Sequence, residues 1–284
     1  MERTKKKSIV LRMLTSRFLW LIIVFALIVG AVIKMAQDKI EEARSTYGGL
    51  SEEGGVEYSF VEANGFSRDE YNFLSYEDDE YYTRRGIDVS AFQGDIDWNA
   101  VKESGVEFVM IRVGYRGYET GTIYLDEKFE QNIDGANAAG IDVGVYFFSQ
   151  AITVEEAIEE AQFVCEQIKH KTISMPVAFD MEPNTYSESD RIHYLTIREI
   201  TELSDAFCTV VEKHGYDPII YGNPAWIHNN LNLSLINGRE IWLAHYTDYS
   251  RFPYKYKLWQ YTDSGVVGGI GTLVDLDLQF IKKQ

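Results

Sequence analysis

The stretch 175-MPVAFDMEPN-184 carries a hydrophobic run straight into two carboxylates and then stops at a proline. Side chains at positions i and i+2 of a β-strand share one face, so Ala178, Asp180 and Glu182 point the same way. Phe179 and Met181 then point to the opposite face, where we expect helices to cover them. A buried strand with two acids at its carboxyl end is typical of a barrel that has its site at that end.

Strand-like and helix-like patterns alternate on both sides of this stretch. The expected strands are Gly86–Ser90, Phe108–Gly114, Val143–Ser149, Val177–Glu182, Ile219–Gly222, Ile241–His245, Leu258–Tyr261 and Val274–Phe280. The expected helices are Trp98–Glu103, Glu127–Ala139, Val154–His170, Asp190–His214 and Pro224–Leu231. Strands that alternate with helices indicate an α/β fold with parallel strands, and about eight strands in one domain favour a closed barrel over an open sheet.

The composition is that of an acidic globular protein. The chain has 284 residues and a formal net charge of −17 at pH 7, which argues against nucleic acid as a partner. Cys165 and Cys208 lie in helical patterns, so we expect buried free thiols, with a disulfide as the alternative. The sequence has no CxxC or HExxH spacing, and we expect no metal or other cofactor.

The N-terminal segment has the pattern of a membrane anchor. Residues 1–17 form a basic tail, and residues 18–33 carry neither a charge nor a proline. A bilayer core takes about 20 residues of helix, so we expect 18–34 to be a transmembrane signal anchor; a cleaved signal peptide is the alternative. The positive-inside rule then puts the N-terminus in the cytoplasm and the remainder outside the cell membrane.

Residues 35–85 connect this anchor to the domain. They are polar and acidic and contain two glycine pairs. This composition predicts a stalk that sets the distance between the membrane and the domain and takes no part in a reaction. Within the stalk, 69-DEYNFLSY-76 is a candidate short helix. The globular domain is expected to occupy residues 86–284.

The paired acids predict a definite chemistry. Two carboxyl groups side by side in a partly buried pocket cannot both ionise freely, so the pKa of one should rise. The raised acid can donate a proton while its charged neighbour stabilises a cation, as in glycoside cleavage. A salt-bridged loop or a calcium site is the other interpretation. Asp88 on a second expected strand, with Asp275 and Asp277 on a third, favours catalysis because these acids can converge with Asp180 and Glu182.

The segment 86-GIDVSAFQGDIDWNAVKESGVEFVMIRVGYRG-117 resembles the opening of glycoside hydrolase family 25, the Chalaropsis-type lysozymes. The resemblance continues, in order, through 143-VGVYFFS-149, 176-PVAFDMEP-183, 215-GYDPIIYGN-223, 240-EIWLAHY-246 and 258-LWQYTDSGVVGGIGTLVDLDLQF-280. It implies a modified (β/α) barrel of five β/α units followed by three strands. A chitinase-like alternative would need a further aspartate at position 178, which is Ala178 here.

The resemblance also implies an activity, hydrolysis of the β-1,4 bond between N-acetylmuramic acid and N-acetylglucosamine in peptidoglycan. The acids of the family map onto Asp88, Asp180, Glu182 and Asp275. Glu182 matches the proton donor, and Asp180 matches the residue that assists directly or through the substrate's N-acetyl group. We therefore expect a membrane-anchored hydrolase that faces the wall and remodels it locally. The alternatives are a non-catalytic wall-binding tether on the same barrel and a glycosidase for another N-acetylated polymer.

Side chains near the strand ends are candidates for contact with the glycan strand. Aromatic rings can stack on sugar faces, although core packing explains each ring equally well, and amides can bond N-acetyl groups. The candidates are Tyr146, Tyr221, Trp242, Tyr246 and Trp259 for stacking, and Gln93, Asn223 and Gln260 for hydrogen bonding.

Overall fold

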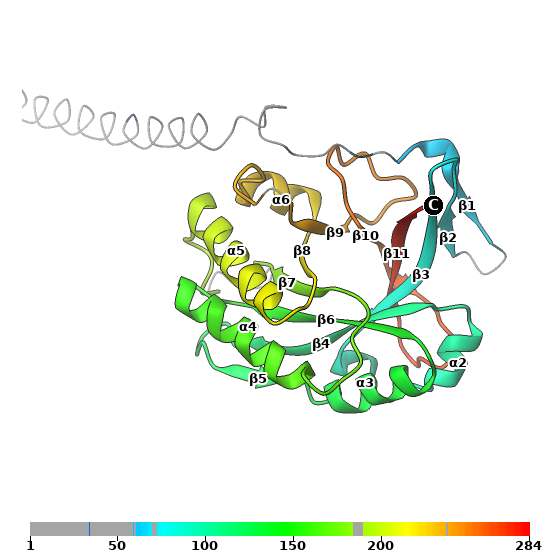
Figure 1. Ribbon diagram of the computed structural model, residues 1–284, viewed down its shortest axis with the longest axis horizontal. Helices are drawn as coiled ribbons and strands as arrows, with labels where there is room; N and C mark the ends of the chain where they lie inside the picture. The colour runs from blue at the N-terminus through cyan, green and yellow to red at the C-terminus, as the bar shows by residue number, and fades with distance from the viewer. Residues whose placement is uncertain (1–33, 35–58, 60, 70–72, 184–189, 237) are drawn as a thin grey trace, which may run out of the picture. The chain divides into compact units, whose positions relative to one another are not determined.

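The computed structural model describes residues 34, 59, 61–69, 73–183, 190–236 and 238–284 (Figure 1). The expected basic tail, the expected anchor apart from Lys34, and residues 35–58 of the expected stalk lie outside the described residues. Within the described part of the chain, no helix is both long and apolar enough to cross a membrane.

Eight strands pair in order and close into a barrel. In chain order they are β3 (Tyr81–Val89), β4 (Phe108–Arg116), β6 (Asp142–Ser149), β7 (Val177–Met181), β8 (Pro218–Gly222), β9 (Glu240–Ala244), β10 (Leu258–Gly265) and β11 (Val274–Lys282). Neighbours from β3 to β10 are parallel, whereas β11 pairs antiparallel with both β10 and β3. The pairing of β3 with β4 completes the ring, and the short strand β5 (Ile123–Leu125), which was not expected, pairs with β4 outside it.

Helices follow the first five barrel strands. They are α2 (Trp98–Glu103), α3 (Phe129–Ala138), α4 (Val154–Ile168), α5 (Ile197–Lys213) and α6 (Pro224–Asn230). The expected order of five β/α units followed by three strands is therefore confirmed. Cys165 on α4 and Cys208 on α5 are buried free thiols, as expected.

Helix α5 begins later than the sequence pattern indicated. We expected a start at Asp190, but Thr196 caps the helix and exchanges hydrogen bonds with Glu199 in a capping box. The Thr196 hydroxyl accepts from the Glu199 amide (3.3 Å), and the Glu199 carboxylate accepts from the Thr196 amide (2.8 Å). A capping box satisfies two amides that have no partner inside the helix, so it fixes the helix start there.

The expected alternation of faces along β7 is confirmed. Ala178 belongs to the cluster of buried side chains inside the barrel, together with Phe108, Met110, Ile219, Trp242 and Leu258. Phe179 points outward, and its ring centroid lies 5.0 Å from that of Phe207 on α5. The inward face of β7 is therefore the face that carries its acids.

A hairpin precedes the barrel where a stalk was expected. Strands β1 (Phe66–Arg68) and β2 (Leu74–Tyr76) pair antiparallel, and the ring centroids of Phe66 and Trp259 lie 5.4 Å apart. Strand β2 replaces part of the helix expected over 69–76, because its two apolar residues alternate with a serine and are both buried. Strand β3 starts at Tyr81, ahead of the expected boundary at Gly86. The described residues of 61–85 therefore pack with the barrel.

Candidate active site

A pocket of about 250 Å³ opens at the carboxyl ends of the parallel strands. Four carboxyl groups line it, those of Asp88 on β3, Asp180 and Glu182 at the end of β7, and Asp275 on β11. Asp88 and Asp275 are direct register partners on adjacent strands. The expected convergence of acids from three strands is therefore present in the structure.

The carboxyl groups of Asp180 and Glu182 both have raised pKa values. Burial, followed by the charge of Glu182, raises the pKa of Asp180 well above its ordinary value. Burial also raises the pKa of Glu182, with a further contribution from Asp275. We expected one raised acid beside an ordinary one, with Glu182 as the raised group. The pKa of Asp180 is raised as well, because Asp180 lies within the strand and is almost fully buried. The pair is best described as two carboxyl groups that share one proton.

Gln260 holds the carboxylate of Asp88 in place. Its Nε2 donates to Oδ2 of Asp88 (2.7 Å). Its Oε1 accepts from the hydroxyls of Tyr221 (2.9 Å) and Tyr246 (3.1 Å). These three expected glycan-binding residues do line the pocket, but in this structure their polar groups are used to orient one another and Asp88.

A further acid lies beneath the pocket. Asp277 is fully buried and its Oδ1 accepts from the Trp242 indole (2.7 Å). Burial raises the pKa of Asp277 to about 7, and burial raises the pKa of Asp275 to about 6. Burial, with Asp275 and Asp277 nearby, raises the pKa of Asp88 well above its ordinary value. The acids in and beneath the pocket therefore all have raised pKa values, because burial disfavours their charged forms.

Two expected glycan-binding residues lie elsewhere. Trp259 is fully buried, packs against Phe66 and donates from its indole to the carbonyl of His245 (2.9 Å). It follows Leu258 and precedes Gln260 on β10, so its side chain lies on the face opposite the pocket. Asn223 caps α6, because its Oδ1 accepts from the amide of Trp226 (2.8 Å).

The other expected residues line the pocket, together with some that the sequence reading missed. Gln93, Tyr146 and Trp242 are present as expected. Arg112, Phe92, Phe148 and Ser90 were not expected. The signal for Arg112 was available, because it shares the inward face of the apolar strand β4 with Met110. Within the described residues, no group of three or more His, Cys, Asp or Glu side chains is arranged to hold a metal ion.

The backbone of Glu182 is held by a buried glutamine. Gln150 Nε2 donates to the carbonyl of Glu182 (3.1 Å), and the carbonyl of Gln150 accepts from Nη1 of Arg191 (3.0 Å). Arg191 in turn forms an ion pair with Glu156 of α4 (2.7 Å). These contacts connect the end of β7 to the first turn of α4.

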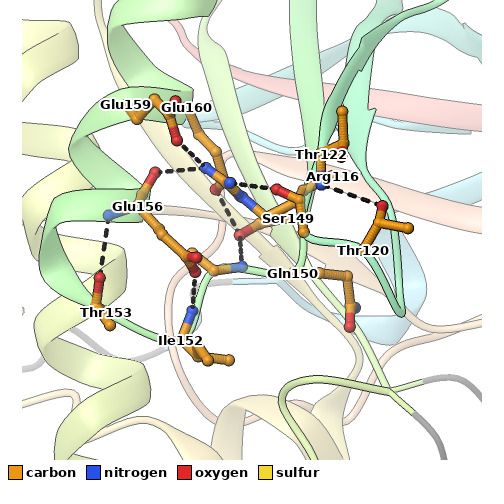
Figure 2. A network of polar contacts seen from close by, with 12 residues as sticks. Arg116, Thr120, Thr122, Ser149, Gln150, Ile152, Thr153, Glu156, Glu159 and Glu160 are labelled. Carbon is orange, nitrogen blue, oxygen red and sulfur yellow. Dashed lines mark hydrogen bonds and ion pairs between the residues drawn. The ribbon is translucent and has the colours of Figure 1, made fainter.

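Next to Gln150, an ion pair joins β4 to α4 (Figure 2). Nε of Arg116 donates to Oε1 of Glu160 (2.6 Å), and the Ser149 hydroxyl donates to Oε2 (2.6 Å). Arg116 also contacts Glu159 (2.8 Å) and the carbonyl of Gly121 (2.6 Å). Both carboxylate oxygens of Glu160 therefore have a donor, although burial still raises the pKa of Glu160 to about 7.

Comparison with known sequences identifies relatives over most of the barrel. The sequence model of glycosyl hydrolases family 25 matches residues 87–270. The autolytic lysozyme of Clostridium acetobutylicum is 31% identical over 194 residues, 68% of this chain and 55% of that protein. Lysozyme M1 of Streptomyces globisporus is 29% identical over 202 residues, 67% of this chain and 66% of that protein. This chain thus spans about half the length of the first of these relatives.

Solved structures share the fold. A family 25 glycosyl hydrolase from Bacillus anthracis superposes with a TM-score of 0.55 at 23% identity, over 69% of this chain and 88% of that chain. The modular autolysin LytC from Streptococcus pneumoniae, solved with a synthetic peptidoglycan ligand, gives a TM-score of 0.65 at 22% identity, over 80% of this chain and 52% of that chain. At these identities the likeness supports the barrel fold alone.

Proposed function

The chain belongs to glycosyl hydrolases family 25, and from that membership we propose that it is a peptidoglycan hydrolase. The bond cleaved is the β-1,4 bond between N-acetylmuramic acid and N-acetylglucosamine. The observation that carries the proposal is the pocket in which four carboxyl groups converge and one adjacent pair, Asp180 and Glu182, has raised pKa values. Such a pair retains a proton at a pH where an ordinary carboxyl group has lost it.

In the proposed mechanism, Glu182 acts as the general acid. It transfers its proton to the glycosidic oxygen as the bond to the anomeric carbon breaks. Asp180 is then the ionised member of the pair and stabilises the developing positive charge, directly or through the substrate's N-acetyl group. The pair's one proton lies on Glu182 when the sugar is bound and leaves with the glycosidic oxygen, so both carboxyl groups are ionised beside the developing cation. Water adds to the anomeric carbon and returns a proton to Glu182. Asp88 and Asp275 complete the acidic wall around the reacting sugar.

Product chemistry tests this function. The full-length chain is incubated with purified peptidoglycan, the products are reduced with borohydride, and the reduced sugar is identified. We expect muramitol. Glucosaminitol would indicate a glucosaminidase, and no new reducing ends would indicate a non-catalytic tether. Cleavage of chitin in preference to peptidoglycan would indicate a glycosidase for another N-acetylated polymer.

The stereochemistry of the product separates the roles of the acids. Participation of the N-acetyl group predicts retention, so NMR of the fresh product should show the β-anomer first. An initial α-anomer would mean direct inversion by a water that a second carboxylate activates. Asp180→Asn and Asp88→Asn are each expected to lower activity, because each removes a negative charge near the developing cation.

We also propose a location. Residues 18–34 hold the enzyme in the cell membrane with the N-terminus in the cytoplasm and the barrel outside, facing the wall. The support is the uninterrupted apolar run and the basic flank on one side of it. The test is cell fractionation with protease treatment of spheroplasts. Full-length protein should be in the membrane pellet, and external protease should trim it. A mature form in the medium that starts near residue 35 would show a cleaved signal peptide instead.

A further inference from the structure

The carboxyl group of Asp277 lies beneath the candidate active-site pocket and is closed off from it. Asp277 shares the inward face of β11 with Asp275, which lies two residues nearer the pocket. Its register partner on β3 is Gly86, and the ring of Phe108 fills the space where a side chain at position 86 would stand. Gly86 therefore places no side chain between Asp277 and Asp88, which lies two residues further along β3.

The two oxygens of Asp277 have different surroundings. Oδ1 accepts from the Trp242 indole (2.7 Å), whereas Oδ2 is buried and, within the described residues, receives no amide, indole or hydroxyl donor. A hydrogen bond joins the carboxyl groups of Asp277 and Asp88, and Oδ2 of Asp88 also accepts from Gln260 (2.7 Å). Ionised carboxylates only accept hydrogen bonds, so this bond requires a proton on one of the two acids.

The charges around the pair also call for a proton. In the described part of the chain, the cation that lines the pocket is Arg112, and it forms an ion pair with Asp126 (2.7 Å). After burial, the charge of Asp275 further raises the pKa of both Asp88 and Asp277. The other titratable groups described near the pair supply no positive charge; they are Asp180, Glu182, Tyr146, Tyr221, Tyr246 and Tyr261. Two buried negative charges side by side would be costly, and one proton removes one of them.

We propose that Asp277 is a positioning residue that shares one proton with Asp88 and thereby sets the charge that Asp88 presents to the sugar. This inference rests on the proposed function. Before the reaction, Asp88 holds the proton and donates it to Asp277. Positive charge on the sugar favours the ionised form of the nearer acid, Asp88, so the proton moves to Asp277. Once water has added to the sugar the proton returns, and the pair gains and loses no proton overall.

Asparagine substitutions imitate the two positions of the proton. In Asp277→Asn, the amide oxygen can keep the bond from Trp242 while the amide nitrogen donates to an ionised Asp88. In Asp88→Asn, the amide oxygen can keep the bond from Gln260 while the amide nitrogen donates to an ionised Asp277. Either substitution therefore replaces the same shared proton by an N–H group.

Infrared spectroscopy of the full-length chain tests the sharing directly. At about pH 8, above the pKa of about 7 that Asp277 has, the pair can hold only one proton. We expect one protonated-carboxyl band in wild type that disappears in Asp277→Asn and equally in Asp88→Asn. Glu182→Gln identifies the separate band of the Asp180–Glu182 pair. A band that persists in either variant, or that is absent from wild type, would overturn the inference.

Thermal unfolding gives a second test that needs no activity. Each single asparagine variant should unfold close to wild type, whereas Asp88→Asn combined with Asp277→Asn places two N–H groups against each other. The double variant should unfold about 3 °C or more below either single variant. The matched control is Asp275→Asn combined with Asp277→Asn, which should unfold no lower than its single variants. A variant with both Asp88 and Asp277 replaced that is as stable as wild type would mean two separate charges without a shared proton.

Kinetics measure what the shared proton does for the reaction. Asp277→Leu leaves Asp88 without its partner and should lower the kcat of the folded fraction about five- to twentyfold, with KM little changed. Asp277→Asn should recover most of that loss, because its amide still bonds to Asp88. A leucine variant as active as wild type, or an asparagine variant no better than leucine, would contradict the positioning role. If the wild-type chain cleaves no glycan, the proposed hydrolysis fails, and the infrared and unfolding results still decide whether the proton is shared.

Discussion

Asp180 and Glu160 are both buried carboxyl groups on neighbouring elements, yet their surroundings differ. Each oxygen of Glu160 has a donor, from Arg116 at one side and Ser149 at the other. Asp180 has another acid, Glu182, beside it, and within the described residues nothing donates to its Oδ1. Burying a carboxyl group without partners lowers stability, and a fold retains such a group where it serves chemistry. Burial alone therefore does not identify a catalytic acid; Asp180 differs from Glu160 because its Oδ1 has no donor and because it lies beside a second acid in the pocket.

The largest expected effect tests this contrast with the same chemical change in both places. Glu182→Gln is expected to lower kcat by about 10²–10⁴-fold, because the amide cannot donate a proton to the leaving oxygen. The thermal unfolding midpoint should stay close to that of wild type. The matched control is Glu160→Gln, which should keep the kcat of the folded fraction while lowering the unfolding midpoint. A Glu182→Gln variant within threefold of wild-type activity would contradict the assignment.

The next effect concerns Glu160, the buried acid that has a donor at each carboxylate oxygen. Arg116→Met leaves Glu160 buried without its cation and is expected to lower the free energy of unfolding by about 3–5 kcal/mol. Adding Glu160→Leu should recover much of that loss, because no uncompensated charge then remains. Urea unfolding followed by circular dichroism measures both values. Equal instability of the single and double variants would mean that packing, rather than charge pairing, dominates at this site.

A smaller effect is expected at Gln150, which connects the surroundings of the Arg116–Glu160 ion pair to the backbone of Glu182. Gln150→Leu removes the hydrogen bond to the carbonyl of Glu182 and should lower kcat about five- to tenfold, as the loss of roughly 1 kcal/mol predicts. KM should change little, because Gln150 lies below the surface. An altered pH profile, with unfolding kept near wild type, would separate misplacement of Glu182 from general loss of structure. A kcat equal to that of wild type would show that β7 alone positions Glu182.

The smallest effect is a change in pH dependence. Activity needs one proton on the Asp180–Glu182 pair, so it should persist above the ordinary range of carboxyl pKa values and decline as rising pH removes that proton. Asp275 is a nearby negative charge that raises the pKa of Glu182. Asp275→Asn removes that charge, lowers the pKa of Glu182 and should move the alkaline limb to lower pH by about 1 unit or less. The measurement is kcat against pH, and a limb that moves to higher pH would contradict the electrostatic account.

The sequence was sufficient for the barrel and for the acids, because period-two alternation within strands is a strong local signal. The same rule, applied to β10, would have placed Trp259 opposite Gln260 and removed it from the glycan-binding set. Asn223 stands immediately before Pro224, and an Asn followed by Pro is a signal for the start of a helix. We instead interpreted the polar side chain of Asn223 as a glycan ligand. The position of Phe92 beside Arg112 depends on the meeting in space of two different β/α units, the first of which carries Phe92 and the second Arg112. The hairpin before β3 was missed because its strands are only three residues long.

The antiparallel strand β11 has a consequence for the timing of assembly. Asp88 and Asp275 become neighbours only when β11 inserts between β10 and β3. During synthesis, β3 and its carboxyl group emerge early and must wait for nearly the whole barrel to follow. A nascent or shortened chain without β11 therefore lacks both a closed ring and a complete acid set. Because β11 closes the ring and supplies Asp275, we expect no hydrolysis from the growing chain before β11 has been made and has reached its place.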